Sequence, residues 1–182
     1  GVSIEHVDWS PETVSKIMGM SVEKLYETQP HLRTVVSFLA RNIAQLPVQT
    51  FGRVDDTDRR RSTSDPVALA LKYPNAFQTQ YELMYSTVSE LKLYDVAVWM
   101  VIPSAESRSG WEIRLIPQSW IAQTGGGSKW SPEWLMFYDK SSKPPVMLTS
   151  ENFILFHGFN PGAPGKGLSP VEALKQVLAE QI

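Results

Sequence analysis

Residues 165–172 combine glycine, lysine and a hydroxyl side chain in an order close to that of a phosphate-binding loop. In such a loop, G-x-x-x-x-G-K-S/T, the first glycine opens a nest of backbone N–H groups, the lysine reaches the phosphates and the hydroxyl holds magnesium. Asn160 stands where the first glycine is required, and Gly167 stands where the hydroxyl is required. Pro161 and Pro164 also remove two N–H donors. The segment is therefore not a nucleotide site, and we predict no cofactor.

The same segment has the features of a helix start. Ser169 is a preferred N-cap residue, Pro170 suits the first helical position and Glu172 completes a capping box. Apolar residues then recur at helical spacing, namely Val171, Leu174, Val177, Leu178 and Ile182. Because this pattern is still running at Ile182, we expect a fragment of a longer protein, truncated within its C-terminal helix.

Three histidines are present, His6, His31 and His157, and none is followed three or four residues later by a histidine or an acid. A helical metal site needs that spacing, so we predict no metal. The ring of His157 could orient a nucleophile, but we favour a hydrogen bond to a loop carbonyl. A small α+β hydrolase using His157 with Ser169 or an acid stays an alternative, although there is no G-x-S-x-G motif and we predict no catalytic residues.

Charged residues concentrate between residues 52 and 65, where three aspartates, Asp55, Asp56 and Asp58, precede Arg59, Arg60 and Arg61. A calcium loop would need glycine at its sixth position and glutamate at its twelfth, and both are missing. Three arginines could contact a phosphate backbone, but the neighbouring aspartates weaken such a site. We therefore interpret the segment as a solvated turn whose arginines form salt bridges at a rim or an interface.

Five of the six tryptophans lie close together in sequence: Trp99, Trp111, Trp120, Trp130 and Trp134. They could form a stacking surface, but Trp99 and Trp111 fall within strand patterns, which favours the core. Trp130 and Trp134 flank a turn, and we predict them to be interface anchors. Exposed tryptophans would also suit a generic protein-interaction module, which is the second alternative.

The composition is that of an ordinary globular protein, 42% hydrophobic and 20% charged over 182 residues. A net charge of −2 argues against a protein whose whole surface binds nucleic acid. The lack of cysteine excludes disulfides and thiolate chemistry and is typical of a reducing compartment. No apolar run reaches the ~18 residues of a membrane span, so we predict no membrane contact.

Periodicity and caps predict helices in the first half of the chain. They cover residues 31–46, 66–73 and 80–94, with a shorter one near residues 21–26. The helix over 31–46 has one apolar face, formed by Leu32, Val35, Val36, Leu39, Ile43 and Leu46. Asp65 caps the next helix, and Thr79 with Glu82 forms a capping box for the third. Residues 1–28 otherwise lack a period and are predicted to be an N-terminal arm.

The second half has the pattern of short strands. They are expected over residues 96–102, 111–115, 134–138, 146–148 and 153–156, in addition to an earlier strand at residues 48–51. The run of glycines at 125–128 is predicted to be a hairpin tip or loop. Helices, then antiparallel strands, then a further helix make an α+β fold, so residues 29–182 are predicted to form one α+β domain.

The order of these signals is similar to that of HK97-type portal proteins of tailed bacteriophages. Residues 43–51, IAQLPVQTF, resemble the family's ia-x-lP-l-x-vy segment, and residues 65–75, DPVALALKYPN, resemble hPl-x-x-lL-x-x-PN. Further likenesses are LIPQSWI at 115–121 to L-x-p-l-x-P-x-x-v, ENFILFH at 151–157 to eDiiHi, and GLSPV at 167–171 to G-x-SPl. Two places depart: Asp95 begins the segment where the family has Gly-Asn-Ala, and Asn152 replaces an acid.

The resemblance implies a structural protein without a reaction centre. Portal proteins form a ring, dodecameric in the capsid, at one vertex of the virion, after assembly in the host cytoplasm. Double-stranded DNA passes non-specifically through the central channel of the ring. The ring itself docks the terminase large subunit and later the capsid and head-completion proteins. Residues 29–182 would then be the peripheral wing-like domain, with the channel-lining parts beyond Ile182.

Overall fold

The computed structural model describes residues 18–53, 55, 57–128, 130–139 and 144–180. Its helices are α2 (Val22–Thr28), α3 (Pro30–Ala44), α4 (Pro66–Lys72), α5 (Gln80–Tyr94) and α6 (Pro170–Glu180), with a single turn of 3₁₀-helix, η1 (Gln118–Trp120). Its strands are β1 (Thr50–Arg53), β2 (Arg59–Ser62), β3 (Val96–Pro103), β4 (Trp111–Ile116), β5 (Ile121–Gly125), β6 (Trp134–Phe137), β7 (Val146–Thr149) and β8 (Phe153–His157). The predicted α+β class is confirmed.

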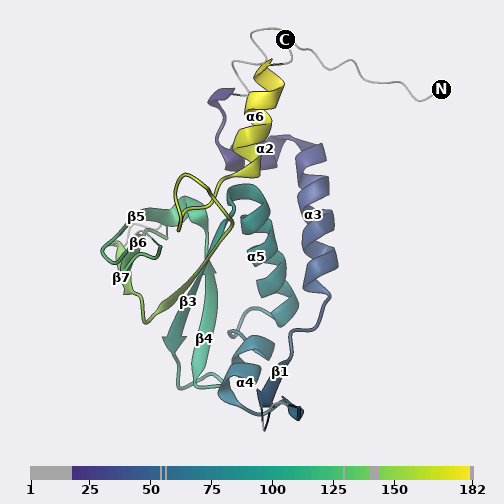
Figure 1. The fold of residues 1–182 in the computed structure, drawn as a ribbon, viewed down its shortest axis with the longest axis vertical. Helices are drawn as coiled ribbons and strands as arrows, with labels where there is room; N and C mark the ends of the chain where they lie inside the picture. The colour runs from purple at the N-terminus through teal and green to yellow at the C-terminus, as the bar shows by residue number, and fades with distance from the viewer. Residues whose placement is uncertain (1–17, 54, 56, 129, 140–143, 181–182) are drawn as a thin grey trace, which may run out of the picture.

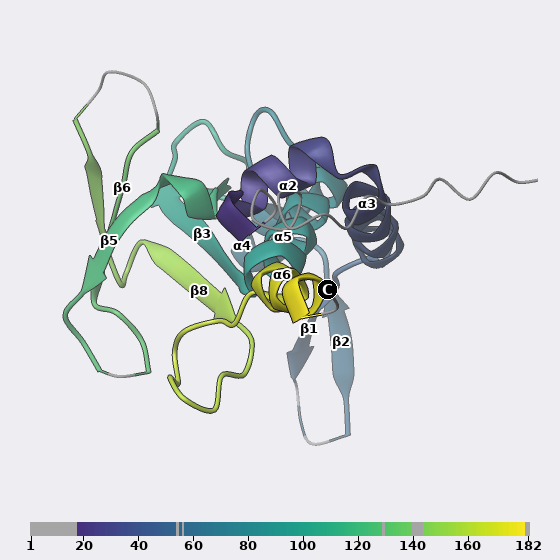
Figure 2. The same cartoon turned by 90° about the horizontal axis from the view of Figure 1, so that it is seen from above.

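A central antiparallel sheet of order β4-β3-β8 separates two layers (Figures 1 and 2). Helices α4 and α5 cover one face, where Leu83 packs with Trp99 and Ile113. The second sheet, β5-β6-β7, covers the other face, where Val98 packs with Leu135. Neighbouring residues of β3 thus enter different cores, which explains why the β3 sequence is apolar without alternation.

A third cluster joins the helices at one end of the molecule. Val22 and Leu25 of α2 pack with Val36 of α3, Leu93 of α5 and Val171 of α6. Lys175 of α6 is buried in this region, at 5% exposure. Its Nζ donates to the carbonyl of Met20 at 2.6 Å and to Glu172 Oε1 at 2.8 Å. The first described residues and the last helix are therefore joined at this end (Figure 1).

Local capping chemistry predicted the helix starts correctly. The side chains of Ser21, Asp65 and Thr79 each accept a backbone N–H at the start of α2, α4 and α5. The reciprocal capping box of Thr79 and Glu82 is complete, and Ser169 accepts from the N–H of Glu172 at 3.3 Å. These caps depend on residues within one turn, so sequence alone reveals them.

The structure differs from the sequence analysis in four places. Trp111, expected in the core, is 41% exposed because it lies at the end of β4, an edge strand. On α3 the fully buried positions are Val36, Ala40 and Ala44, whereas Val35 is exposed, because α5 covers only part of the predicted apolar face. The segment expected to be a turn contains a strand, β2, and residues 121–125 form the strand β5, which was not predicted.

Strands β1 and β2 form a separate two-stranded hairpin, which projects from the body of the molecule (Figure 2). Thr50 is paired with Ser62 at its base and Arg53 with Arg59 near its tip. Thr50 Oγ1 donates to the carbonyl of Ser62 at 2.9 Å and to Asp65 Oδ2 at 3.4 Å. These bonds attach the base of the hairpin to the start of α4.

Candidate functional site

The two residues considered for hydrolysis both have hydrogen-bond partners in the backbone. His157 Nδ1 lies 2.9 Å from the carbonyl oxygen of Gly158. Ser169 Oγ donates to the carbonyl of Leu93 at 2.6 Å while it accepts the cap bond from Glu172. Of the three histidines, His6 lies outside the described residues. Within the described part of the chain no three potential metal ligands come together.

Two aspartates near the tip of the hairpin, Asp55 and Asp58, have partners within the hairpin. Asp55 Oδ1 accepts from Asp58 N at 2.7 Å, from Thr57 N at 2.8 Å and from Thr57 Oγ1 at 2.9 Å. These bonds, the one from the Asp58 backbone first, lower the pKa of Asp55. Asp58 in turn pairs with Arg60, whose Nε lies 3.2 Å from Asp58 Oδ2. We predicted salt bridges between the arginines at 59–61 and the neighbouring aspartates. Among the described residues, the pair of Asp58 and Arg60 is the one that forms.

The other arginines of the hairpin share one face. Phe51 is paired with Arg61, and Arg53 is paired with Arg59. Directly paired residues of an antiparallel ladder point to the same side, as do residues two apart on a strand. The four side chains therefore lie together on what we call the arginine face, and Arg60 lies on the opposite face. Residues 59–61 are all arginine, so the sequence does not assign them to different faces, and only the pairing with β1 reveals the arrangement.

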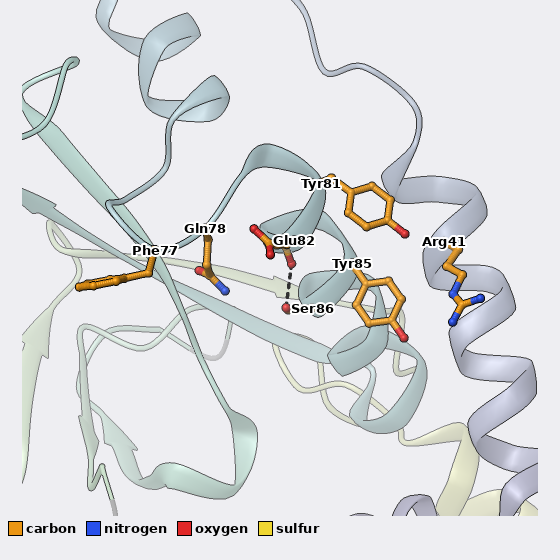
Figure 3. Close-up of a pocket in the computed structure, with 7 residues that line it drawn as sticks. All are labelled: Arg41, Phe77, Gln78, Tyr81, Glu82, Tyr85 and Ser86. Atoms are coloured by element: carbon orange, nitrogen blue, oxygen red, sulfur yellow. Dashed lines mark hydrogen bonds between the residues drawn. The ribbon is translucent and has the colours of Figure 1, made fainter.

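A shallow groove lies between α3 and the start of α5 (Figure 3). Its aromatic side chains are Phe77, Tyr81 and Tyr85, and the two tyrosine rings stack at 6.3 Å between centroids. Glu82 also lines it, but its carboxylate accepts from Thr79 N and Oγ1, which lowers its pKa. The groove thus has a mixed aromatic and polar lining, without a reactive pair among the groups that line it.

The family comparison decides what kind of protein carries this geometry. The model of the family described as phage portal protein matches residues 30–182. The chain belongs to the phage portal protein family. This family is structural, not enzymatic, and the resemblance in the order of the sequence motifs is confirmed at this level. No curated protein matches the chain.

Solved structures share the fold of this portal-family chain. The neck of an empty GTA (gene transfer agent) particle, computed with C6 symmetry, aligns with a TM-score of 0.67 at 18% identity over 94% of this chain and 43% of that one. The neck of the native GTA particle, computed with C12 symmetry, aligns with a TM-score of 0.62 at 16% identity, over 94% of this chain and 42% of that one. An HK97 family phage portal protein from Corynebacterium diphtheriae aligns with a TM-score of 0.44 at 16% identity, over 83% of this chain and 45% of that one. The chain therefore spans less than half the length of the solved chains it matches.

One departure from the portal motif has a structural explanation. Asp95 stands where the motif has glycine, and it adopts φ 59° at the C-cap of α5. Asp95 Oδ2 accepts from Leu168 N at 3.0 Å, and its carbonyl accepts from Gly158 N at 3.0 Å. A Cβ on Gly158 or Gly167 would collide with Asp95. Residues 165–172 of this portal-family chain therefore belong to the connection from β8 to α6, which packs closely against Asp95.

A half-buried acidic cluster between α2, α5 and η1 was not predicted. Glu90 Oε2 accepts from the backbone N–H of Gln118 at 3.0 Å, and Tyr94 Oη donates to Glu23 Oε1 at 2.6 Å. Burial raises the pKa of Glu90 to about 7, and the charge of Glu23 adds to this. Burial also raises the pKa of Tyr94. A glutamate within an amphipathic helix gives no sequence signal that it is buried.

The tryptophans proposed as interface anchors differ in exposure. Trp130 is 68% exposed, in the connection between β5 and β6. Trp134 is half-buried, and its ring occupies the space that a Cβ on Gly125 would need. Trp99, predicted to be in the core, is buried and donates to Thr87 Oγ1 at 2.8 Å. Trp130 thus presents the larger free aromatic surface of the two.

Proposed function

We propose that the whole protein is the structural subunit of a portal ring at the unique vertex of a phage capsid. The match of residues 30–182 to the portal family carries this proposal. The similar neck structures were computed with sixfold and twelvefold symmetry, which supports a closed ring of identical subunits, and a dodecamer fits both. In this proposal the protein works in the virion and, during assembly, in the host cytoplasm.

Within that ring, residues 29–182 would form a wing-like domain preceded by an arm over residues 1–28. The channel-lining parts would belong to the portion of the longer portal chains that this sequence does not span. Assembly and passage of DNA need no bond-breaking step, so we infer that the protein is not an enzyme. The engaged hydroxyl of Ser169 and the local bond of His157 support this reading.

The ring would contact other proteins through its exposed surfaces. We propose the terminase large subunit during packaging, and capsid and head-completion proteins at later stages, as partners. Trp130 and the arginines of β2 are exposed and remain our predicted interface or rim residues, together with the half-buried Trp134. Replacement of Trp130 by alanine should weaken one of these contacts in a pull-down with purified partners, while the mass of the ring stays the same.

Double-stranded DNA would pass through the channel without tight binding. A net charge of −2 on this portion supports low friction, because extensive phosphate pairing would slow translocation. The affinity of the assembled ring for DNA of unrelated sequences, measured against salt, tests this. We expect weak binding at physiological salt, and sub-micromolar, sequence-independent binding would contradict the proposal.

Ring formation is tested by light scattering after size exclusion of the full-length protein. A particle with the mass of roughly twelve subunits supports the portal proposal. A strict monomer at every concentration would count against it and would favour a generic interaction module.

A further inference from the structure

The arginine face of the β1–β2 hairpin is turned towards solvent. Thr50 and Ser62 belong to the opposite face, and the bond from Thr50 to Asp65 directs that face towards α4. Arg59 and Arg61 are both exposed, and Phe51 beside them is 55% exposed. Because the hairpin projects from the body of the molecule (Figure 2) and these side chains are exposed, the arginine face is accessible to a partner.

Two guanidinium groups on this face are uncompensated. The salt bridges of the described residues include Arg60 with Asp58 but none that involves Arg59 or Arg61. Asp55 is held by its own turn, and Asp58 is held by Arg60 on the opposite face. Two of the aspartates that weakened a phosphate site in the linear sequence, Asp55 and Asp58, are thus engaged by the turn and by Arg60.

We propose that the arginine face binds the phosphate backbone of double-stranded DNA without reading its sequence. An exposed guanidinium offers phosphate a rigid, two-pronged set of donors. Arg59 and Arg61 are two residues apart on one strand, which separates them by about 7 Å and suits a regularly spaced polyanion. A two-stranded ribbon also fits the major groove, while contacts to phosphate carry no sequence information.

A second copy of the chain is the less favoured occupant. Several of its carboxylates already have partners: Glu27 with Lys24, Glu82 with Thr79, Glu112 with Arg114 and Glu172 with Lys175. A protein surface whose carboxylates are engaged gives up existing bonds to bind an arginine. The phosphates of DNA exchange only mobile counterions, which favours DNA at this face.

The expected binding is weak and depends steeply on salt. Each neutralised phosphate changes log K by about −0.9 per unit of log salt concentration. With two contacts, from Arg59 and Arg61, affinity should fall about 12-fold between about 50 and about 200 mM salt. Such binding is weak at physiological salt, and the proposal does not rest on ring formation.

The test uses the full 182-residue chain and short fluorescent duplexes of two unrelated sequences, with binding followed by anisotropy across that range of salt. The double variant Arg59→Gln/Arg61→Gln should remove most of this salt slope, so that affinity changes by less than about 2-fold over the range. The matched control, Arg60→Gln, changes the same charge type on the opposite face and should reduce the slope by less than half a unit or so. Circular dichroism checks that both variants fold.

Three outcomes would overturn the proposal. One is a wild-type chain that does not bind either duplex at low salt. Another is a loss in Arg60→Gln as large as that in the double variant, which would point to overall charge instead of one face. The third is a double variant whose DNA binding is unchanged while its self-association, measured by light scattering, falls, which would assign the face to a second copy.

Discussion

Helix α6, which contains Lys175, and the β1–β2 hairpin, which contains Arg59, lie towards opposite ends of the molecule (Figure 1). These two residues show how position decides the role of a charge. Lys175 is buried, and its ammonium group donates to Met20 and Glu172. Arg59 is exposed, and the described residues give it no salt bridge. A buried charge must be paired to be tolerated, whereas an exposed one stays hydrated and available. The charge of Lys175 therefore stabilises the packing of α6 against the N-terminal segment, whereas the charge of Arg59 in the hairpin is available to bind a partner.

The same contrast applies to carboxylates. Glu90 is enclosed beside Glu23 and Tyr94, and its pKa rises to about 7. Asp55 lies at the hairpin tip, and backbone hydrogen bonds lower its pKa. The carboxyl of Glu90 is thus only partly ionised at neutral pH, whereas the carboxyl of Asp55 at the hairpin tip is ionised. Stability at the two ends should respond differently to mutation and to pH.

The largest effect is expected from removing the buried ammonium group. Lys175→Met keeps the length of the side chain but leaves the Met20 carbonyl without its donor and Glu172 without its partner. We expect a loss of about 3 kcal/mol in the free energy of unfolding, measured by urea denaturation. The control, Lys24→Met, removes an exposed pair with Glu27 and should cost less than about 0.5 kcal/mol. Equal losses of stability in Lys175→Met and Lys24→Met would contradict the proposed difference between buried and exposed charges.

The next effect concerns pH. A carboxyl whose pKa is raised in the folded state binds its proton more tightly there than in the unfolded chain, so stability falls as pH rises. For Glu90 this fall covers the window from about 4.5 to about 7. Glu90→Gln should remove this fall and make the protein about 2 kcal/mol more stable than the wild type at pH 8. Denaturation curves at several pH values measure it.

Glu151→Gln, at an exposed position, provides the matched control for the pH experiment. It should leave the pH dependence as in the wild type. If Glu90→Gln also follows the wild-type curve, Glu90 does not titrate between pH 4.5 and 7, and the half-buried acidic cluster has no pH-sensitive group of this kind.

The smallest effect on stability is expected at the hairpin. The double variant Arg59→Gln/Arg61→Gln should shift Tm by less than about 2 °C in thermal unfolding, because neither side chain holds another element. The same variant should change DNA binding clearly. A large loss of stability instead would mean that the arginine face supports the fold.

Local chemistry made much of the fold predictable. Caps at Asp65 and Thr79 fixed helix starts, and the apolar run of β3 fixed the central strand. Strand β2 was missed because its arginines are exposed on both faces, and such a strand has no apolar alternation. The segregation of Arg59 from Arg60 depends on pairing with β1, and the burial of Glu90 depends on α2 and η1. Both are tertiary facts that local patterns do not contain.

Electron microscopy of the full-length protein tests the central claim most directly. We predict closed rings with an open central channel, in which the domain formed by residues 29–182 repeats around the axis at the periphery. Particles without rotational symmetry, or a monomer without a channel, would contradict the assignment of this chain to a portal ring.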